Sequence, residues 1–292
     1  MITMLLRLFG IFFCAVSAAL AELPDIRTVA ADLVVPEMRD GVPAAGQRVR
    51  HWLAGREKSP VYHVLYLPPE WKAGSKWPVI VEWAGNGGYT NKYGDVSSGR
   101  PEGSYLGYGL SGGTGCIWLC IPYLNAAGDD LALKWWGDAP TYDAQPTLNY
   151  AREAVAAICR DFSGDAQRVL LCGFSRGAIA CGFLGLHDDE TAAQWSGFFA
   201  YSHFDGVRPW PYAGSDRDSA LKRLQRLRGR PVFICGEGEN AAQTESYLRP
   251  LLPTADLTFL CTGFRNHNDA WTLRPSPARE KARDWLQRVL KQ

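Results

Sequence analysis

Short apolar runs recur from residue 61 onward, and segments with a helical spacing of apolar residues lie between them. The runs predict strands at 61–67, 79–83, 116–123, 168–174, 196–201, 231–235 and 257–261. The segments between them predict helices at about 145–161, 178–186, 218–228, 241–249 and 278–290. Strands that alternate with helices in this way favour a mainly parallel sheet with helices on both faces.

Two long stretches, 85–115 and 125–143, show neither the apolar runs of strands nor the apolar spacing of helices. Both are rich in glycine, aromatic and polar residues. Segments of this length without secondary structure usually carry a function. Both follow predicted strands, and loops at the carboxyl ends of strands surround the site in an open α/β sheet. We therefore expect both stretches to form walls of a substrate-binding site. Whether they also form a lid is left open by the sequence.

The first 21 residues have the pattern of a secretory signal peptide. Arg7 precedes an apolar block at 8–16, and Ala19-Leu20-Ala21 supplies small residues before Glu22. A transmembrane anchor is the alternative, but the block is shorter than the roughly 20 residues that span a bilayer. We expect a secreted or periplasmic protein with no membrane anchor after cleavage, in which residues 22–292 form a single domain.

The charges of the chain nearly balance, with 31 lysines and arginines against 30 aspartates and glutamates. This balance argues against a nucleic-acid partner that is recognised through a basic surface. The basic residues between 217 and 230 alternate with leucines, as they do on the solvated face of an amphipathic helix.

Eight cysteines are present, and all except Cys14 follow the predicted signal peptide, so an odd number remains. Several lie in apolar strand-like runs, where a thiol acts as a small hydrophobic group, and a disulfide scaffold is not expected. Cys116 and Cys120 have no neighbouring histidine or carboxylate to complete a metal site. We expect no metal and no organic cofactor.

Ser175 is the candidate nucleophile. It lies in Gly173-Phe174-Ser175-Arg176-Gly177, directly after a predicted strand and before a predicted helix. A serine hydroxyl that attacks a carbonyl must be held out toward a base, and a sharp strand-to-helix turn does this. Such a turn crowds the backbone, so small residues are needed two positions on either side, as Gly173 and Gly177 provide.

A base beside the serine must come from five histidines. His267 is our choice, because it follows the last predicted strand and lies after Ser175 in the chain. His203 is the rival base, since it ends the run at 196–201, and we expect it to line the substrate pocket instead. His51 and His63 lie upstream of the central strands, and His187 fits a surface position.

A carboxylate that orients the base should leave a strand between Ser175 and His267. The segment Cys235-Gly236-Glu237-Gly238-Glu239 supplies two at such a position. We choose Glu239 as the orienting acid and keep Glu237 as the alternative.

The order Ser175, Glu239, His267 resembles that of the α/β-hydrolase superfamily. The resemblance implies an α/β-hydrolase fold with a mainly parallel central sheet and helices on both faces. In that superfamily the acid is often the Asp of a His-Gly-x-x-Asp segment at the end of a strand. In the segment from Cys235 to Glu239, Cys235 stands in place of the histidine and Glu239 in place of the aspartate.

An oxyanion hole usually combines the N–H after the nucleophile with one from an early loop. The first is the N–H of Arg176. The segment Trp83-Ala84-Gly85-Asn86 resembles the early His-Gly loop of these hydrolases, which makes the N–H of Asn86 the second donor. A phosphate-binding loop is the competing interpretation, but the Gly-Lys-Ser/Thr of such loops is missing here.

The segment from Tyr66 to Val81 resembles secreted polyhydroxybutyrate-depolymerase-like and feruloyl esterases. The pair Ser175-Arg176 is similar to glucuronoyl esterases, in which the arginine assists the oxyanion, although a structural role for the Arg176 side chain fits equally. Several tryptophans follow predicted strands or lie in loops, where flat rings can stack on sugars. They are Trp83, Trp135, Trp136, Trp210 and Trp271.

These patterns predict a serine hydrolase that cleaves carboxylic esters, with Trp83, Trp136 and His203 in contact with the substrate. A small-molecule or polysaccharide-linked ester, acetyl, feruloyl or glucuronoyl, is the expected partner. Two alternatives stay open: a serine peptidase of the same fold, and a non-catalytic carbohydrate-binding protein on a hydrolase scaffold.

Overall fold

The structure, a computed structural model, describes residues 22–291. The signal peptide predicted at residues 1–21 lies outside the described residues, and so does Gln292.

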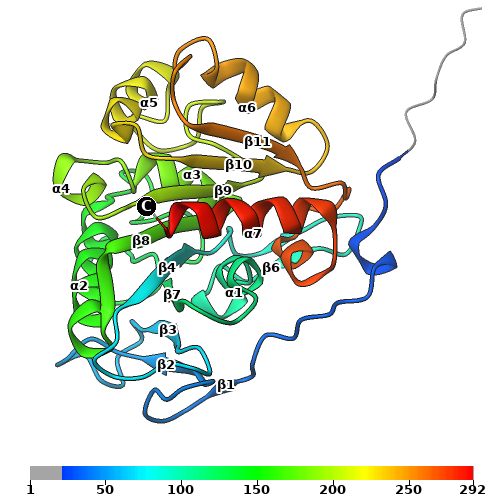
Figure 1. Cartoon of the computed structure of the whole chain (residues 1–292). Coiled ribbons are helices and arrows are strands. Elements are labelled where there is room, and N and C mark those ends of the chain that lie inside the picture. Colours follow the sequence, from blue (N-terminus) through cyan, green and yellow to red (C-terminus); the bar gives the residue numbers. More distant parts are fainter. Residues whose placement is uncertain (1–21, 292) are drawn as a thin grey trace, which may run out of the picture.

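A nine-stranded sheet runs through the molecule in the order β1-β2-β3-β7-β4-β8-β9-β10-β11 (Figure 1). From β7 through β4 to β11 every pair of neighbours is parallel, whereas β3 is antiparallel to both β2 and β7. The strands are Met38–Arg39 (β1), Arg48–His51 (β2), His63–Tyr66 (β3), Trp77–Trp83 (β4), Ile117–Ile121 (β7), Gly164–Phe174 (β8), Gly197–Tyr201 (β9), Val232–Gly236 (β10) and Leu257–Cys261 (β11). A separate hairpin joins Tyr89–Thr90 (β5) to Val96–Ser97 (β6).

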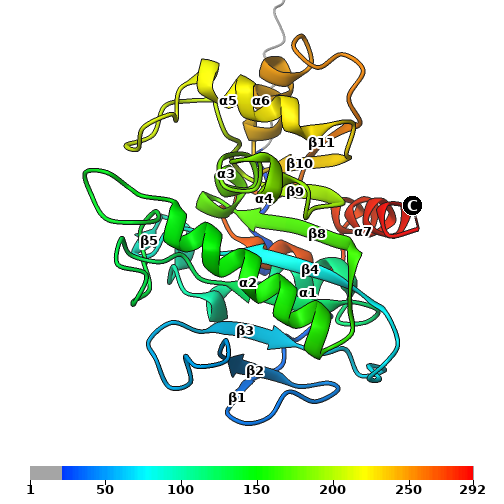
Figure 2. The ribbon, with the colours of Figure 1, turned by 90° about the vertical axis from the view of Figure 1, so that its left-hand side faces the viewer.

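Helices cover both faces of the sheet. They are Leu106–Ser111 (α1), Gln145–Asp161 (α2), Arg176–Phe183 (α3), Asp189–Ala192 (α4), Arg217–Leu224 (α5), Asn240–Leu248 (α6) and Pro277–Val289 (α7), with 3-10 turns at Ile26–Thr28, Pro101–Gly103, Gln225–Leu227 and Asp269–Leu273. In Figure 1, α7 and α1 lie in front of the sheet, and Figure 2 shows α2 crossing the opposite face.

Two hydrophobic clusters follow from the alternation of side chains along the strands. In β4, Val79 and Val81 face one cluster, which includes buried residues of α2, α3 and α6, and Ile80 faces the other, which includes α1 and α7. Because both faces are buried, the central strands are apolar throughout, which is why they stand out in the sequence.

The predicted strands and helices from residue 61 onward correspond to observed elements with shifts of a few residues, and α2 spans the predicted 145–161. The sequence did not predict β1, β2, the β5–β6 hairpin or α1. The last two lie inside the stretch 85–115, where α1 contains two glycines in six residues and therefore has little intrinsic helical preference.

Within residues 22–291, no helix is long and apolar enough to cross a membrane. The cysteines of the same residues are all free, and Cys261 is exposed rather than buried in its strand.

The carboxyl ends of β7, β4, β8, β9, β10 and β11 meet at one edge of the sheet, because these strands are parallel neighbours. The segments that leave this edge carry Ser175, His267 and the residues that contact them.

Candidate active site

Ser175 lies at a tight turn between β8 and α3, with φ 56° and ψ −110°. This backbone conformation is costly for a residue other than glycine and persists only where the surroundings impose it. A Cβ atom at Gly173 would lie 2.2 Å from the carbonyl carbon of Gly177, and one at Gly177 would lie 2.0 Å from the carbonyl oxygen of Trp83. Both glycines are therefore required by close approach of the backbone, as the sequence indicated.

His267 reaches Ser175 from the loop that follows β11. Its Nε2 atom lies 3.0 Å from Oγ of Ser175. The backbone N–H of His267 donates to Oδ2 of Asp95 at 3.1 Å, and Asp95 is itself buried. Asp269, two residues further on, accepts a hydrogen bond from the N–H of Tyr105. The loop is thus tied to the stretch 85–115 at the histidine itself and two residues after it.

Glu237 is the carboxylate that contacts His267: its Oε1 atom lies 2.8 Å from Nδ1. The choice of Glu239 is wrong, because its side chain is exposed and Glu239 is the residue that precedes α6. Glu237 is the first residue after β10, and Gly238, at φ 54°, turns the chain before Glu239. The alternative that the sequence left open is the one that the geometry favours.

Glu237 is held in its ionised form. Burial alone would raise the pKa of its carboxyl, but the hydrogen bond and charge of His267, together with the hydrogen bond from Ser202, lower the pKa below its ordinary 4.5. The Oε1 atom also accepts from Nδ2 of Asn240 at 2.8 Å. Three donors therefore converge on one carboxylate oxygen.

Ser202 is a residue of this site that sequence reasoning missed. Its Oγ atom lies 2.9 Å from Oε1 of Glu237 and 2.9 Å from Nδ1 of His267, and the residue is buried. Ser202 has a φ of 87°, which a non-glycine residue rarely adopts. The signal in the sequence was its position, directly after the run that forms β9.

The two predicted oxyanion donors follow neighbouring strands, β8 and β4. Arg176 is the first residue of α3, where backbone N–H groups have no acceptor within the helix. Asn86 follows β4, and its Oδ1 accepts from the N–H of Trp135 at 2.9 Å. A hydrogen bond from the Arg176 side chain to the carbonyl oxygen of Gly85 ties the Asn86 loop to the start of α3.

No family model and no curated protein matches the sequence. Solved structures do match the whole fold, including a ferulic acid esterase at 15% identity and a TM-score of 0.55, over 84% of this chain and 96% of that one. A thermostable esterase (13%, TM-score 0.52) matches over 82% of this chain, which spans 62% of its length. Dipeptidyl peptidase 4 of Porphyromonas gingivalis (14%, TM-score 0.53) matches over 85% of this chain and 36% of that one.

The chain has an α/β-hydrolase fold. The fold predicted from the sequence is thereby confirmed. Because the identities are low, the likeness extends to the fold alone, and the matching proteins include both esterases and a peptidase.

In this α/β-hydrolase fold the side chain of Arg176 binds the two long stretches together. Its Nη2 atom donates to the carbonyl oxygens of Gly85 and Gly99, from the stretch 85–115. Its Nη1 atom donates to those of Ala132 and Trp135, from the stretch 125–143. The guanidinium is buried, and its burial lowers the pKa of Arg176 to about 10.

No carboxylate pairs with Arg176 within residues 22–291. Instead its Cζ atom lies 3.7 Å from the ring centroid of Tyr123, a cation–π arrangement. The side chain is thus a cross-link between loops, while its backbone N–H remains the candidate oxyanion donor.

Two of the tryptophans that we expected to contact substrate are buried. Trp83 and Trp136 are both 0% exposed and belong to the hydrophobic cluster on the α2 face. The expectation was wrong because a ring at a strand exit can point into the core as readily as into a cleft. Trp135 and Trp210 are partly exposed, with ring centroids 5.2 Å apart, and offer aromatic surface instead.

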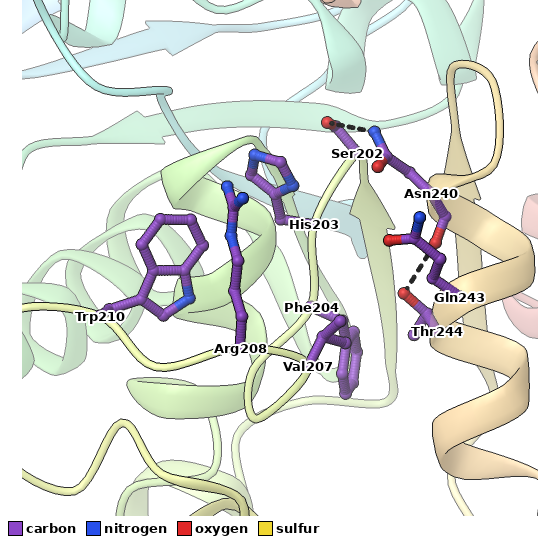
Figure 3. A pocket seen from close by; sticks show the side chains of 9 residues that line it. All are labelled: Ser202, His203, Phe204, Val207, Arg208, Trp210, Asn240, Gln243 and Thr244. Carbon is purple, nitrogen blue, oxygen red and sulfur yellow. Dashed lines mark hydrogen bonds between the residues drawn. The ribbon is translucent and has the colours of Figure 1, made fainter.

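Figure 3 shows a small pocket of about 50 Å³, lined in part by Ser202 and Asn240, which both hydrogen-bond to Glu237. His203 forms part of its wall, and its ring centroid lies 5.3 Å from that of His267. That His203 contacts the substrate stays a prediction. Burial lowers the pKa of His203 to about 4, so its ring is neutral near pH 7.

A larger groove of about 490 Å³ is lined by Asn268, the residue after His267, together with Tyr105, Ser97 and Leu33. Within residues 22–291, no cluster of three histidine, cysteine or acidic residues is arranged to hold a metal ion.

Proposed function

We propose that the protein is a serine hydrolase that cleaves carboxylic esters through an acyl-enzyme. The observation that carries this proposal is the chain of contacts from Ser175 Oγ to His267 Nε2 and from His267 Nδ1 to Glu237, at 3.0 and 2.8 Å. A nucleophile, a base and an orienting acid within hydrogen-bond reach are the components of nucleophilic acyl transfer.

In the proposed reaction, Oγ of Ser175 attacks the ester carbonyl carbon while its proton moves to Nε2 of His267. Glu237 accepts the Nδ1–H of His267, which selects the tautomer with a free Nε2 and stabilises the imidazolium that forms. The N–H groups of Asn86 and Arg176 bind the oxyanion. The proton then passes from His267 to the leaving alcohol, and water hydrolyses the acyl-enzyme by the same steps.

We propose small-molecule or carbohydrate-linked esters, with acetyl, feruloyl or glucuronoyl groups, as substrates. The partly exposed rings of Trp135 and Trp210 support this proposal, because aromatic faces beside a site stack on sugars and phenols. We also propose that the protein is secreted or periplasmic, on the basis of residues 1–21. Terminal sequencing of the exported protein tests this point: a first residue of Glu22 is expected, and an intact Met1 contradicts it.

A matched panel tests the activity. The wild type and Ser175→Ala are assayed with acetyl, feruloyl, glucuronoyl and longer acyl esters and with amides of the same acids. Turnover of esters that is lost in Ser175→Ala is expected. Cleavage of amides but not esters would favour a serine peptidase, and turnover of neither class would contradict the proposal and favour a binding protein.

A further inference from the structure

The pocket in Figure 3 adjoins the proposed catalytic residue Glu237, because Ser202 and Asn240, which line the pocket, both donate hydrogen bonds to its carboxylate. It lies between α6 and the segment that follows β9. With a volume of about 50 Å³, it accommodates a small polar group or a few water molecules rather than a whole sugar ring.

The guanidinium of Arg208 is positioned at the mouth of this pocket. Its Cζ atom lies 4.2 Å from the ring centroid of Trp210, and Figure 3 shows the side chain extended beside the indole toward His203. Arg208 is exposed and takes part in no ion pair within residues 22–291. Stacking therefore orients a guanidinium whose hydrogen-bonding capacity is not used by a carboxylate of the protein.

None of the nine residues that line the pocket is acidic. The pKa of His203 is lowered to about 4, chiefly by burial, so that Arg208 is the only charged group of the lining near pH 7. The indole N–H of Trp210 is buried without a hydrogen-bond acceptor in the described part of the chain. The pocket lining thus offers donors and a positive charge but holds no anion of its own. The carboxylate of Glu237, next to the lining, is already occupied by donors from His267, Ser202 and Asn240.

We infer that this pocket binds a carboxylate group of the substrate through the guanidinium of Arg208. The inference rests on the proposed ester hydrolase and specifies its substrate class: esters that carry a carboxylate beside the scissile bond, on the acyl or the alcohol side. Guanidinium and carboxylate groups match in geometry, and two parallel N–H···O bonds give such a pair both strength and direction.

Matched ester pairs that differ only in this charge provide the test. In the first pair, the acetate ester of 4-hydroxybenzoate carries a carboxylate on the alcohol side, and the acetate ester of 4-hydroxybenzamide is its neutral counterpart. In the second pair, the mono-4-nitrophenyl ester of succinate carries a carboxylate on the acyl side, and 4-nitrophenyl butyrate is its neutral counterpart. In the wild type, kcat/KM of the anionic member of at least one pair should exceed that of the neutral member by about tenfold. The preference should shrink as salt is added.

Arg208→Gln should abolish that preference, mainly by raising KM for the anionic ester. Arg217→Gln is the matched control, because Arg217 is also exposed and stacks on an aromatic ring, Tyr247, at 4.7 Å, away from the pocket lining. It should retain the wild-type ratio. Equal kcat/KM within both pairs, or a ratio that Arg208→Gln leaves unchanged, overturns the inference.

A binding measurement on variants without the nucleophile tests this inference independently of the proposed activity. Titration calorimetry with 4-hydroxybenzoate and with succinate, on Ser175→Ala and on Ser175→Ala/Arg208→Gln, needs no turnover. At least one of the two should bind about tenfold more weakly without Arg208. If no ester is hydrolysed by the wild type, the proposed function fails, and the calorimetry still decides whether the pocket binds carboxylates. Equal binding of both compounds to both proteins overturns the inference whatever the activity.

Discussion

Oγ of Ser202 lies 2.9 Å from Nδ1 of His267, on the side of the imidazole that also meets the carboxylate of Glu237. The hydroxyl donates to Oε1 of Glu237, so it joins the His267 N–H on the same oxygen. Ser202 therefore acts as a positioning residue: it fixes the carboxylate and keeps that carboxyl ionised, without reaching Ser175.

Substitution of Ser202 tests this role. Ser202→Ala and Ser202→Gly should both lower kcat by about tenfold, because a hydrogen bond to a charged group is worth about 1.5 kcal/mol or more. Loss of that bond should raise the pKa of Glu237. The acid limb of the pH–rate profile should then shift to higher pH. Glycine suits the φ of 87°, so Ser202→Gly should be the more stable of the two. A lower kcat with an unmoved profile would assign Ser202 a purely structural role.

Glu237→Gln should reduce kcat by about 10³- to 10⁴-fold, because an amide N–H facing Nδ1 favours the wrong tautomer of His267. Glu239→Gln is the matched control and should leave kcat within about twofold of the wild type. Steady-state kinetics on one aryl ester measures both. Equal losses in the two variants, or the larger loss at Glu239, would refute the assignment of Glu237.

The two glutamates also show where sequence reasoning stops. The apolar run at 231–235 placed an acid at a strand exit, since parallel strands of a buried sheet are apolar throughout. Which of two carboxylates turns toward His267 depends on the exact end of β10 and on the positive φ of Gly238. Neither is visible in an apolar pattern, whose boundaries are uncertain by a few residues.

Burial of aromatic residues was unpredictable for a similar reason. Ser175 could be found from its glycine motif and His267 from its position after the last predicted strand, and the fold brings the two together. Trp83 ends β4 and Trp136 lies in the long loop after β7, yet both rings pack inward among residues distant in the sequence. The same holds for Ser202, whose role arises from contacts with residues 35 and 65 positions away.

Arg176 should be important for stability. Arg176→Met leaves four buried or partly buried carbonyl groups without their donor and should lower the free energy of unfolding by about 3 kcal/mol or more. Arg288→Met is a matched control, since Arg288 is exposed on α7, and should change it by less than about 0.5 kcal/mol. Urea unfolding compares the three proteins. A similar stability of Arg176→Met and the wild type would contradict a cross-linking role.

His203 should make the protein sensitive to acid. Its pKa is about 4 in the folded state, chiefly because of burial, against an ordinary value of 6.5. Below pH 6.5 the unfolded chain binds more protons than the folded one, so stability falls with pH until about pH 4. Since the ring is partly exposed, we expect a loss of about 2 kcal/mol from this residue. Thermal unfolding of His203→Asn across this range should show a smaller decline, and an equal decline would contradict the expectation.

Covalent labelling is the most direct test of whether Ser175 is a nucleophile activated by His267. A fluorophosphonate probe is applied to folded protein, and the modified residue is located by mass spectrometry. We expect a single adduct on Ser175, none in Ser175→Ala, and labelling slowed by several orders of magnitude in His267→Ala. Folded wild type that stays unlabelled at Ser175, or that labels as fast without His267, would contradict this expectation.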